Sequence, residues 1–465
     1  GDYNTAVGAY ALDANTTASD NTGVGYLALQ VNTTGPNNTA VGAYSLDANT
    51  TGGQNTALGR SALSANTTAS DNTAVGAYAL DASTTSPYNT AVGRSALSAV
   101  TTGDGRNTAV GYYAGGLLTT GAYNTAVGYQ ALDTATTGTR NTAIGAYALN
   151  DTTTGSYNVA VGYYALEATT TGEYNTALGR NALTANTTAS YNTAIGDQAL
   201  EANTTGASNV AVGRQALEAN TTANNNTAVG YAALGANTTG TGNVAVGAQA
   251  LEVNTTASYN TAIGMQTMES MTTGSNNTAV GHYAMNATTT GIQNTALGLS
   301  ALEGCVDGTQ NVAIGYQAGT ADWGDGNTGV GWRALKVNTA SSNTGMGQNV
   351  LLNNTTGTRN VAVGNYAIGT NTTGNDNTAM GADVLASSTD ASNNTALGRK
   401  AMYATTGGSN NSAIGYEALV ANTTGTGNVA VGMYSLDANT TANYNTAIGY
   451  QSLSANTTGV GGVAV

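Results

Sequence analysis

Two short runs of apolar residues alternate along the whole chain, and each run is bounded by Asn, Gly or Thr. Residues 4–20 read NTAVGAYALDANTTASD and residues 21–37 read NTGVGYLALQVNTTGPN, so the pattern repeats after seventeen residues. Counted from the leading Asn, the first run fills places two to four and the second fills places eight to eleven. This pattern predicts strand, turn, strand and turn, and it leaves no room for a helix of about ten residues. The sequence therefore predicts an all-β fold, a β-solenoid (parallel β-roll) with two short strands per coil.

The repeat continues from one end of the chain to the other. The leading Asn recurs from Asn4 to Asn445, which gives 27 repeats. An array of this kind is one quasi-linear object rather than a set of globular domains. We therefore expect a single continuous array of about 27 seventeen-residue coils over residues 1–465. The array begins and ends out of phase with the repeat, so we expect it to be a segment of a larger protein.

Residues 303–347 form a local irregularity in the array. This stretch holds the single cysteine, Cys305, both tryptophans and two steps of sixteen residues. It is either a tolerated insertion or deletion, or the place of a specific contact or bend.

The alternation of side chains along a strand assigns the faces of the first run. Val7 and its equivalents are expected to point inward, and Thr5 with them, because Val replaces Thr at place two in several repeats. Leu12 is expected to point inward from the second strand. Place three, next to these inward residues, is then expected to face outward.

Two further places of the repeat are expected to hold the coil together. The leading Asn residues are expected to form an internal ladder of bonded amides. This ladder includes Asn4, Asn21, Asn38, Asn124, Asn226 and Asn445. The Gly at place five is expected to provide a left-handed backbone at a corner. These corner residues include Gly8, Gly25, Gly128, Gly230 and Gly449.

Place three holds only Ala or Gly in the complete repeats. Contact with solvent alone would not exclude large polar side chains there, so the small residues indicate the close approach of a second chain. Copying of a duplicated unit is the alternative explanation. The candidate assembly face comprises Ala6, Ala40, Ala57, Ala126, Ala177 and Ala228.

Composition and charge exclude several classes of function. The net charge of −14 argues against a nucleic-acid partner, which needs a basic surface. With a single His282 and a single Cys305, a zinc site, a catalytic triad and any other cofactor are not expected, so we expect no enzyme. No apolar run approaches the roughly 18 residues that would span a membrane.

In many repeats the turn contains the tripeptide NTT. On an exported chain this tripeptide is a candidate acceptor of N-linked glycans; in a folded turn it needs no glycan. The candidate glycosylation sites include Asn15, Asn32, Asn49, Asn66 and Asn186.

The stretches NTAVG and NVAVG resemble the NSVAIG-type head repeats of trimeric autotransporter adhesins. The longer unit NTAVGYQAL, residues 124–132, is similar to repeats of large bacterial surface proteins and phage-fibre-like proteins. This resemblance implies a left-handed parallel β-roll with three chains around one axis. The period here is longer than in the adhesin heads, because extra residues fall in the ANTTG turn, so handedness and trimer packing do not follow directly.

The sequence and the resemblance together predict a structural extracellular fibre or surface stalk that assembles through the Ala-lined face. The expected partners are further copies of the chain, in a homo-oligomer or filament, for which the resemblance implies a trimer, and a glycan is a candidate ligand. The alternative is an adhesin or binding module at the cell surface that recognises a glycan or a host surface. Its binding residues would be the Tyr-rich columns at places six and seven, such as Tyr44, Tyr78 and Tyr112.

Overall fold

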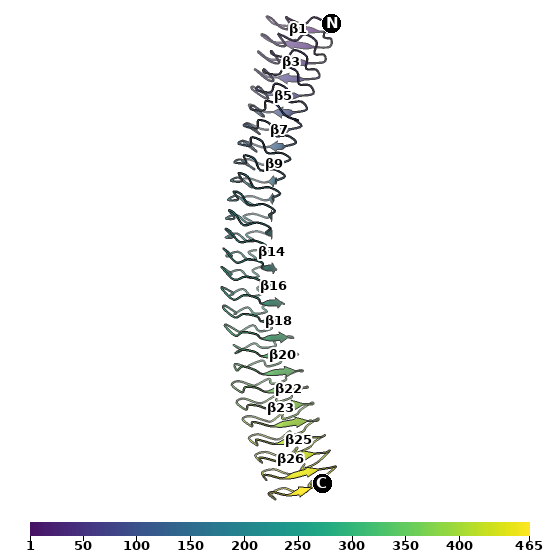
Figure 1. The fold of residues 1–465 in the computed structure, drawn as a ribbon, viewed down its shortest axis with the longest axis vertical. Helices are drawn as coiled ribbons and strands as arrows, with labels where there is room; N and C mark the ends of the chain where they lie inside the picture. The colour runs from purple at the N-terminus through teal and green to yellow at the C-terminus, as the bar shows by residue number, and fades with distance from the viewer. The chain divides into compact units, whose positions relative to one another are not determined.

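The computed structural model describes all 465 residues and divides them into two units, Gly1–Thr239 and Gly240–Val465. Each unit consists of short parallel strands joined by turns, with no α-helix. Within a unit the strands stack one above the next, as Figure 1 shows. The predicted all-β solenoid of about 27 coils is therefore confirmed.

The strands of the first unit pair in parallel, each with the next one along the chain. Equivalent residues of the repeat are opposite each other in this ladder, as Thr5 is opposite Thr22. The strands are β1 (Thr5–Val7), β2 (Thr22–Val24), β3 (Thr39–Val41), β4 (Thr56–Leu58), β5 (Thr73–Val75), β6 (Thr90–Val92), β7 (Thr108–Val110), β8 (Thr125–Val127), β9 (Thr142–Ile144), β10 (Val159–Val161), β11 (Thr176–Leu178), β12 (Thr193–Ile195), β13 (Val210–Val212) and β14 (Thr227–Val229).

The second unit is built in the same way, with Val244 opposite Thr261 at its start. Its strands are β15 (Val244–Val246), β16 (Thr261–Ile263), β17 (Thr278–Val280), β18 (Thr295–Leu297), β19 (Val312–Ile314), β20 (Thr328–Val330), β21 (Thr344–Met346), β22 (Val361–Val363), β23 (Thr378–Met380), β24 (Thr395–Leu397), β25 (Ser412–Ile414), β26 (Val429–Val431), β27 (Thr446–Ile448) and β28 (Val463–Ala464).

Each coil contains one strand, whereas the sequence analysis expected two. In one coil, Leu46 of the second apolar run and Tyr44 just before this run have φ angles of 51° and 58°, in the left-handed region. A strand requires negative φ angles, so these two residues turn the chain instead of extending it. Hydrogen bonds still join the coils here, since the amide of Leu29 donates to the carbonyl of Ser45 at 3.0 Å. The second run is therefore a stacked turn.

The core of each coil is about one large side chain wide. The Leu of place nine fills it and is fully buried, as at Leu46, Leu63 and Leu132. The Ala of places three and eight flanks this Leu. Gly23 shows what place three faces, because a Cβ added there would lie 3.3 Å from the Cγ of Leu12. Only a methyl group fits in this space.

The expected orientation of the first strand is wrong, because place three points inward and places two and four point outward. On strand β11, Ala177 is 0% exposed while its neighbour Leu178 is 47% exposed. Small residues are needed where the strand approaches the Leu of its own solenoid, not where a second chain approaches. The proposed assembly residues Ala40, Ala57, Ala126, Ala177 and Ala228 are buried, and Ala6 is exposed in the first coil. The Ala-lined assembly face is therefore rejected.

The irregular stretch 303–347 contains a substitute for a missing core residue. Place nine is Gly319 in this coil, where most other coils have Leu. A Cβ added to Gly319 would overlap the indole ring of Trp323, which is 1% exposed. The indole Nε1 of Trp323 donates to the backbone carbonyl of Leu335 at 3.0 Å. The tryptophan therefore fills the space of the absent Leu in a coil that is one residue shorter.

The two tryptophans allow a direct test of this substitution. Replacing the buried Trp323 by Ala should lower the free energy of unfolding by about 3–5 kcal/mol, because a large cavity remains. Replacing Trp332, which is 38% exposed, should change it by less than about 1 kcal/mol. Chemical denaturation followed by circular dichroism measures both values. Equal losses in the two variants would contradict the core role of Trp323.

Candidate functional site

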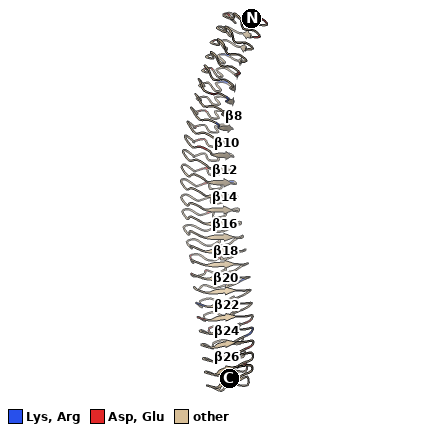
Figure 2. Cartoon of the chain, turned by 45° about the vertical axis from the view of Figure 1, so that its right-hand side comes forward, with Lys and Arg blue, Asp and Glu red and all other residues tan.

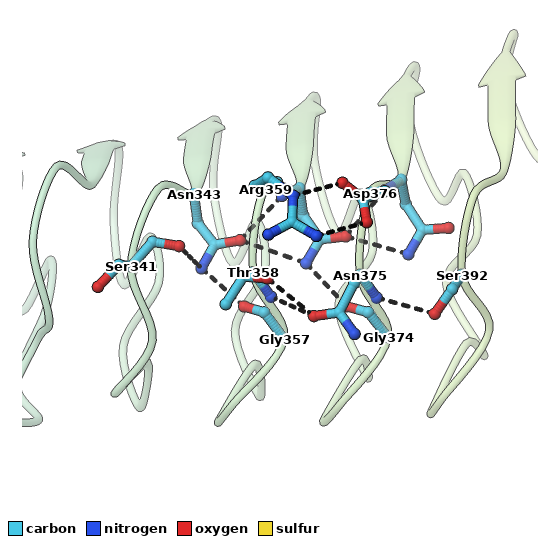
Figure 3. A network of polar contacts seen from close by, with 11 residues as sticks. Ser341, Asn343, Gly357, Thr358, Arg359, Gly374, Asn375, Asp376 and Ser392 are labelled. Atoms are coloured by element: carbon cyan, nitrogen blue, oxygen red, sulfur yellow. Dashed lines mark hydrogen bonds and ion pairs between the residues drawn. The ribbon is translucent and has the colours of Figure 1, made fainter.

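The leading Asn residues lie inside the solenoid and connect neighbouring coils. Asn38 is fully buried, and its Oδ1 accepts a hydrogen bond of 2.9 Å from the backbone amide of Asn55. Its Nδ2 donates to the backbone carbonyl of Gly52 at 2.9 Å. One side chain thus satisfies backbone groups that would otherwise be buried without partners. Figure 3 shows the same column at Asn343 and the coils after it.

The predicted members of this ladder occupy the expected column. Apart from Asn4, which begins the column, the backbone amide of each member donates to the Oδ1 of the preceding Asn, for example from Asn226 to Asn209 at 3.0 Å and from Asn445 to Asn428 at 2.9 Å. Asn21, Asn38, Asn124, Asn226 and Asn445 are buried, and Asn4 is partly buried in the first coil.

The corner glycines also have the predicted backbone. The φ angle is 143° at Gly128 and 136° at Gly230, a conformation that side-chain-bearing residues rarely adopt. A Cβ added at Gly128 would overlap the carbonyl oxygen of Gly145 in the next coil. The corner therefore requires Gly both for its backbone angle and for its close stacking. The same conformation is present at Gly8, Gly25 and Gly449.

The Asn of the NTT turn forms a second buried ladder, which corrects the expectation of glycosylation. Asn49 donates from Nδ2 to the Oδ1 of Asn32 at 2.8 Å, and Asn66 donates to Asn49 at 2.8 Å. Asn32, Asn49, Asn66 and Asn186 are fully buried. The folded coil leaves no room for a sugar on these amides, because they are bonded within the core. Asn15 is partly buried, and its Nδ2 donates to the carbonyl of Ala18 at 3.1 Å.

A third ladder, at place sixteen, was not predicted from the sequence. The backbone amide of Thr358 donates to the Oδ1 of Asn375 at 2.7 Å, and that of Asn375 donates to the Oγ of Ser392 at 3.0 Å. Figure 3 shows this row beside the leading Asn residues. The recurrence of Ser, Thr and Asn at place sixteen was the available signal.

The outer surface of each strand carries two columns of uncharged residues, which we call the strand face. It consists of places two and four, that is, Thr, Val or in one coil Ser, and then Val, Leu, Ile or Met. Leu58 and Leu178 in the first unit are each 47% exposed, and Met380 in the second unit is 50% exposed. Figure 2 shows how few charged residues the chain carries in total. Exposed apolar residues aligned in this way indicate an interaction surface.

The Tyr-rich columns of places six and seven pack along the coils. Tyr26 and Tyr44 lie edge to face with their centres 5.4 Å apart, and Tyr112 stacks on Tyr129 at 5.4 Å. Their rings therefore cover part of one another's surface. The guanidinium of Arg60 lies 5.7 Å from the centre of the Tyr78 ring, in a cation–π arrangement.

The structure contains no group of three or more His, Cys, Asp or Glu residues placed to hold a metal ion. The thiol of Cys305 is buried, and this burial raises its pKa to about 12, so it is a protonated core residue at neutral pH. No helix is long and apolar enough to cross a membrane.

Comparison with known proteins does not assign the chain to a family. No protein-family model matches the sequence, and no curated protein is significantly similar to it. The resemblance to the adhesin head repeats therefore stays a prediction.

Adjacent residues provide a matched test of the leading Asn ladder. Replacing Asn38 by Asp should lower the free energy of unfolding by about 1–3 kcal/mol, because a carboxylate cannot donate to the carbonyl of Gly52. Replacing Asn37, which is exposed, by Asp should have little effect. Thermal unfolding of the two variants gives the comparison. Equal stability would show that the buried amide contributes nothing.

A second matched pair tests the corrected face of the strand. Ala177→Glu places a charge in the core and should cost about 3–5 kcal/mol, whereas Leu178→Glu should cost less than about 1 kcal/mol. Denaturant unfolding of each variant measures the difference. If Leu178→Glu proved the more damaging substitution for the fold, the assignment of the two faces would be wrong.

Proposed function

We propose that this chain is a structural segment of an extracellular fibre or surface stalk, and that it assembles with further copies of itself through the strand face. The observation that carries this proposal is the contrast between the two sides of the strand. Inward places are occupied by Ala, Leu and bonded Asn, whereas the outward places present aligned, uncharged and partly exposed residues in every coil.

The size of the strand face supports self-association. Covering the exposed part of one aliphatic side chain is worth about 1 kcal/mol. The fourteen strands of one unit then contribute on the order of 10 kcal/mol, within the range of about 4–15 kcal/mol that association costs in lost freedom of motion. A few coils would be insufficient, so a long array of repeats serves this purpose.

A second copy is the partner whose surface matches this face best. It has the same spacing of coils, so its columns of Thr and aliphatic residues meet those of the first chain at every rung. Two such faces pack at about 10 Å, as sheets do in other proteins. Neither face carries charge in these columns, so no repulsion opposes the contact.

Replacing apolar residues of the strand face by charged residues tests the assembly. We expect the triple variant Leu58→Glu, Ile144→Glu, Leu178→Glu to be folded but to have a smaller mass than the unchanged chain, because buried unpaired charges oppose the contact. Sedimentation velocity measures the mass, and circular dichroism verifies the fold.

The control variant adds the same charge to exposed turn residues, as Thr68→Glu, Thr137→Glu, Thr171→Glu. It should retain the mass of the unchanged chain. A monomeric unchanged chain, or the same mass for all three proteins, would exclude assembly through the strand face.

A further inference from the structure

Seven consecutive coils of the first unit carry Tyr or Arg at the residue just before the leading Asn. All seven side chains belong to exposed residues. The coils before and after this stretch carry Asp71 and Ser208 at the same place. We call the column the Tyr–Arg ladder, and it comprises Tyr88, Arg106, Tyr123, Arg140, Tyr157, Tyr174 and Tyr191.

The two arginines of the ladder are held between tyrosine rings. The guanidinium carbon of Arg106 lies 5.0 Å from the centre of the Tyr88 ring and 5.3 Å from that of Tyr123. The guanidinium carbon of Arg140 lies 5.3 Å from the centres of both Tyr123 and Tyr157. Since both flank Tyr123 from neighbouring coils, the two cations are about 10 Å apart, or two coil spacings.

The C-terminal part of the ladder is a stack of rings. Tyr157 and Tyr174 are stacked with centres 4.8 Å apart, and Tyr174 and Tyr191 with centres 5.2 Å apart. Ring faces within the stack are therefore covered, and a ligand can reach only the ring edges and the phenol groups. Such a row suits a ligand with many hydroxyl groups that runs along the coil axis, rather than an apolar one.

Neither arginine of the ladder is neutralised by a carboxylate. Arg106 donates to the backbone carbonyl of Asp104 at 3.1 Å, and Arg140 donates to the phenol oxygen of Tyr157 at 2.8 Å. The same column in the second unit differs, because Arg359 forms an ion pair of 2.6 Å with Asp376 on the next coil. The column can thus hold an internal ion pair, and in the Tyr–Arg ladder it does not.

The acidic residues near the ladder lie beside it or at its end. Asp71 precedes Tyr88 by one coil, Asp104 lies two residues before Arg106, and Glu173 directly precedes Tyr174. Burial, Tyr157 and Glu173 together raise the pKa of Tyr174, in that order, so its phenol stays protonated at neutral pH. The coil between the two arginines has Ala122 at the neighbouring place. The positive charge is therefore concentrated between Arg106 and Arg140.

We propose that the Tyr–Arg ladder binds an extended acidic polysaccharide that carries a carboxylate on every second sugar. One sugar ring advances along such a chain by nearly one coil, so each ring meets one rung and two successive carboxylates meet the two guanidiniums. Arginine binds carboxylates through paired hydrogen bonds. An extended acidic peptide fits less well, because its side chains on one face recur at roughly 6.7 Å.

This site is separate from the proposed assembly surface, since it lies just before the leading Asn and the strand face lies at places two and four. The binding test is a calorimetric titration of the full chain with a hyaluronan decasaccharide, which alternates uronic acid and N-acetylhexosamine. We expect saturable binding that weakens as salt is raised. The double variant Arg106→Gln, Arg140→Gln should weaken the affinity about tenfold or more.

The matched control is Arg60→Gln, Arg94→Gln, which removes the same charge from a different column of the same unit. It should leave the affinity unchanged within about twofold. Absence of binding, equal loss in the two double variants, or equal affinity for neutral cellohexaose would overturn the proposal. Tighter binding of an oligoglutamate peptide than of the decasaccharide would overturn the assignment to a polysaccharide. None of these results depends on whether the strand face assembles.

Discussion

The amide side chain of a buried Asn is the interaction on which each unit depends. A coil of seventeen residues encloses about one Leu and a few Ala side chains, which is a small core. The backbone of the turn must enter this narrow interior, and its polar groups have no access to water there. Asn supplies both a donor and an acceptor, so one residue such as Asn55 accepts from the amide of Asn72 and donates to the carbonyl of Ala69. The ladder therefore satisfies groups that burial would otherwise penalise.

This ladder also explains why coils of different length are tolerated. Asn107 follows Asn89 after eighteen residues, and its amide donates to the Oδ1 of Asn89 at 3.1 Å. Asn327 follows Asn311 after sixteen, and the corresponding bond is 2.8 Å. The hydrogen bond between successive leading Asn residues is thus kept, and the turn accommodates the extra or missing residue. Trp323 replaces the missing core volume in the coil that has Gly319 at place nine, whereas the next sixteen-residue coil retains a buried Leu335 there.

The sequence was sufficient to predict the period, the Asn ladder and the corner glycines, because each needs a particular residue type at a fixed place. It was misleading for the strand faces, because Thr and Val alternate at place two and suggested an interior position. The small size of residues such as Ala177 was interpreted correctly as close approach, but the approaching group is Leu of the same solenoid. The left-handed Leu46 was not predictable, since Leu carries no signal for that conformation.

The contacts of an outer residue depend on the coils stacked above and below it, so they cannot be deduced from a single repeat. Arg359, just before a leading Asn, forms an ion pair because the next coil has Asp376 at the same place. Arg140, at the equivalent place, lies between two rings because the coils on both sides have Tyr there. The inner places are constrained by packing and are nearly the same in every coil, so they carry no positional information. The outer places differ from coil to coil, and their chemistry depends on the neighbours above and below. A binding site in such a chain is therefore defined by a run of coils, and any run of outer residues can change without altering the fold.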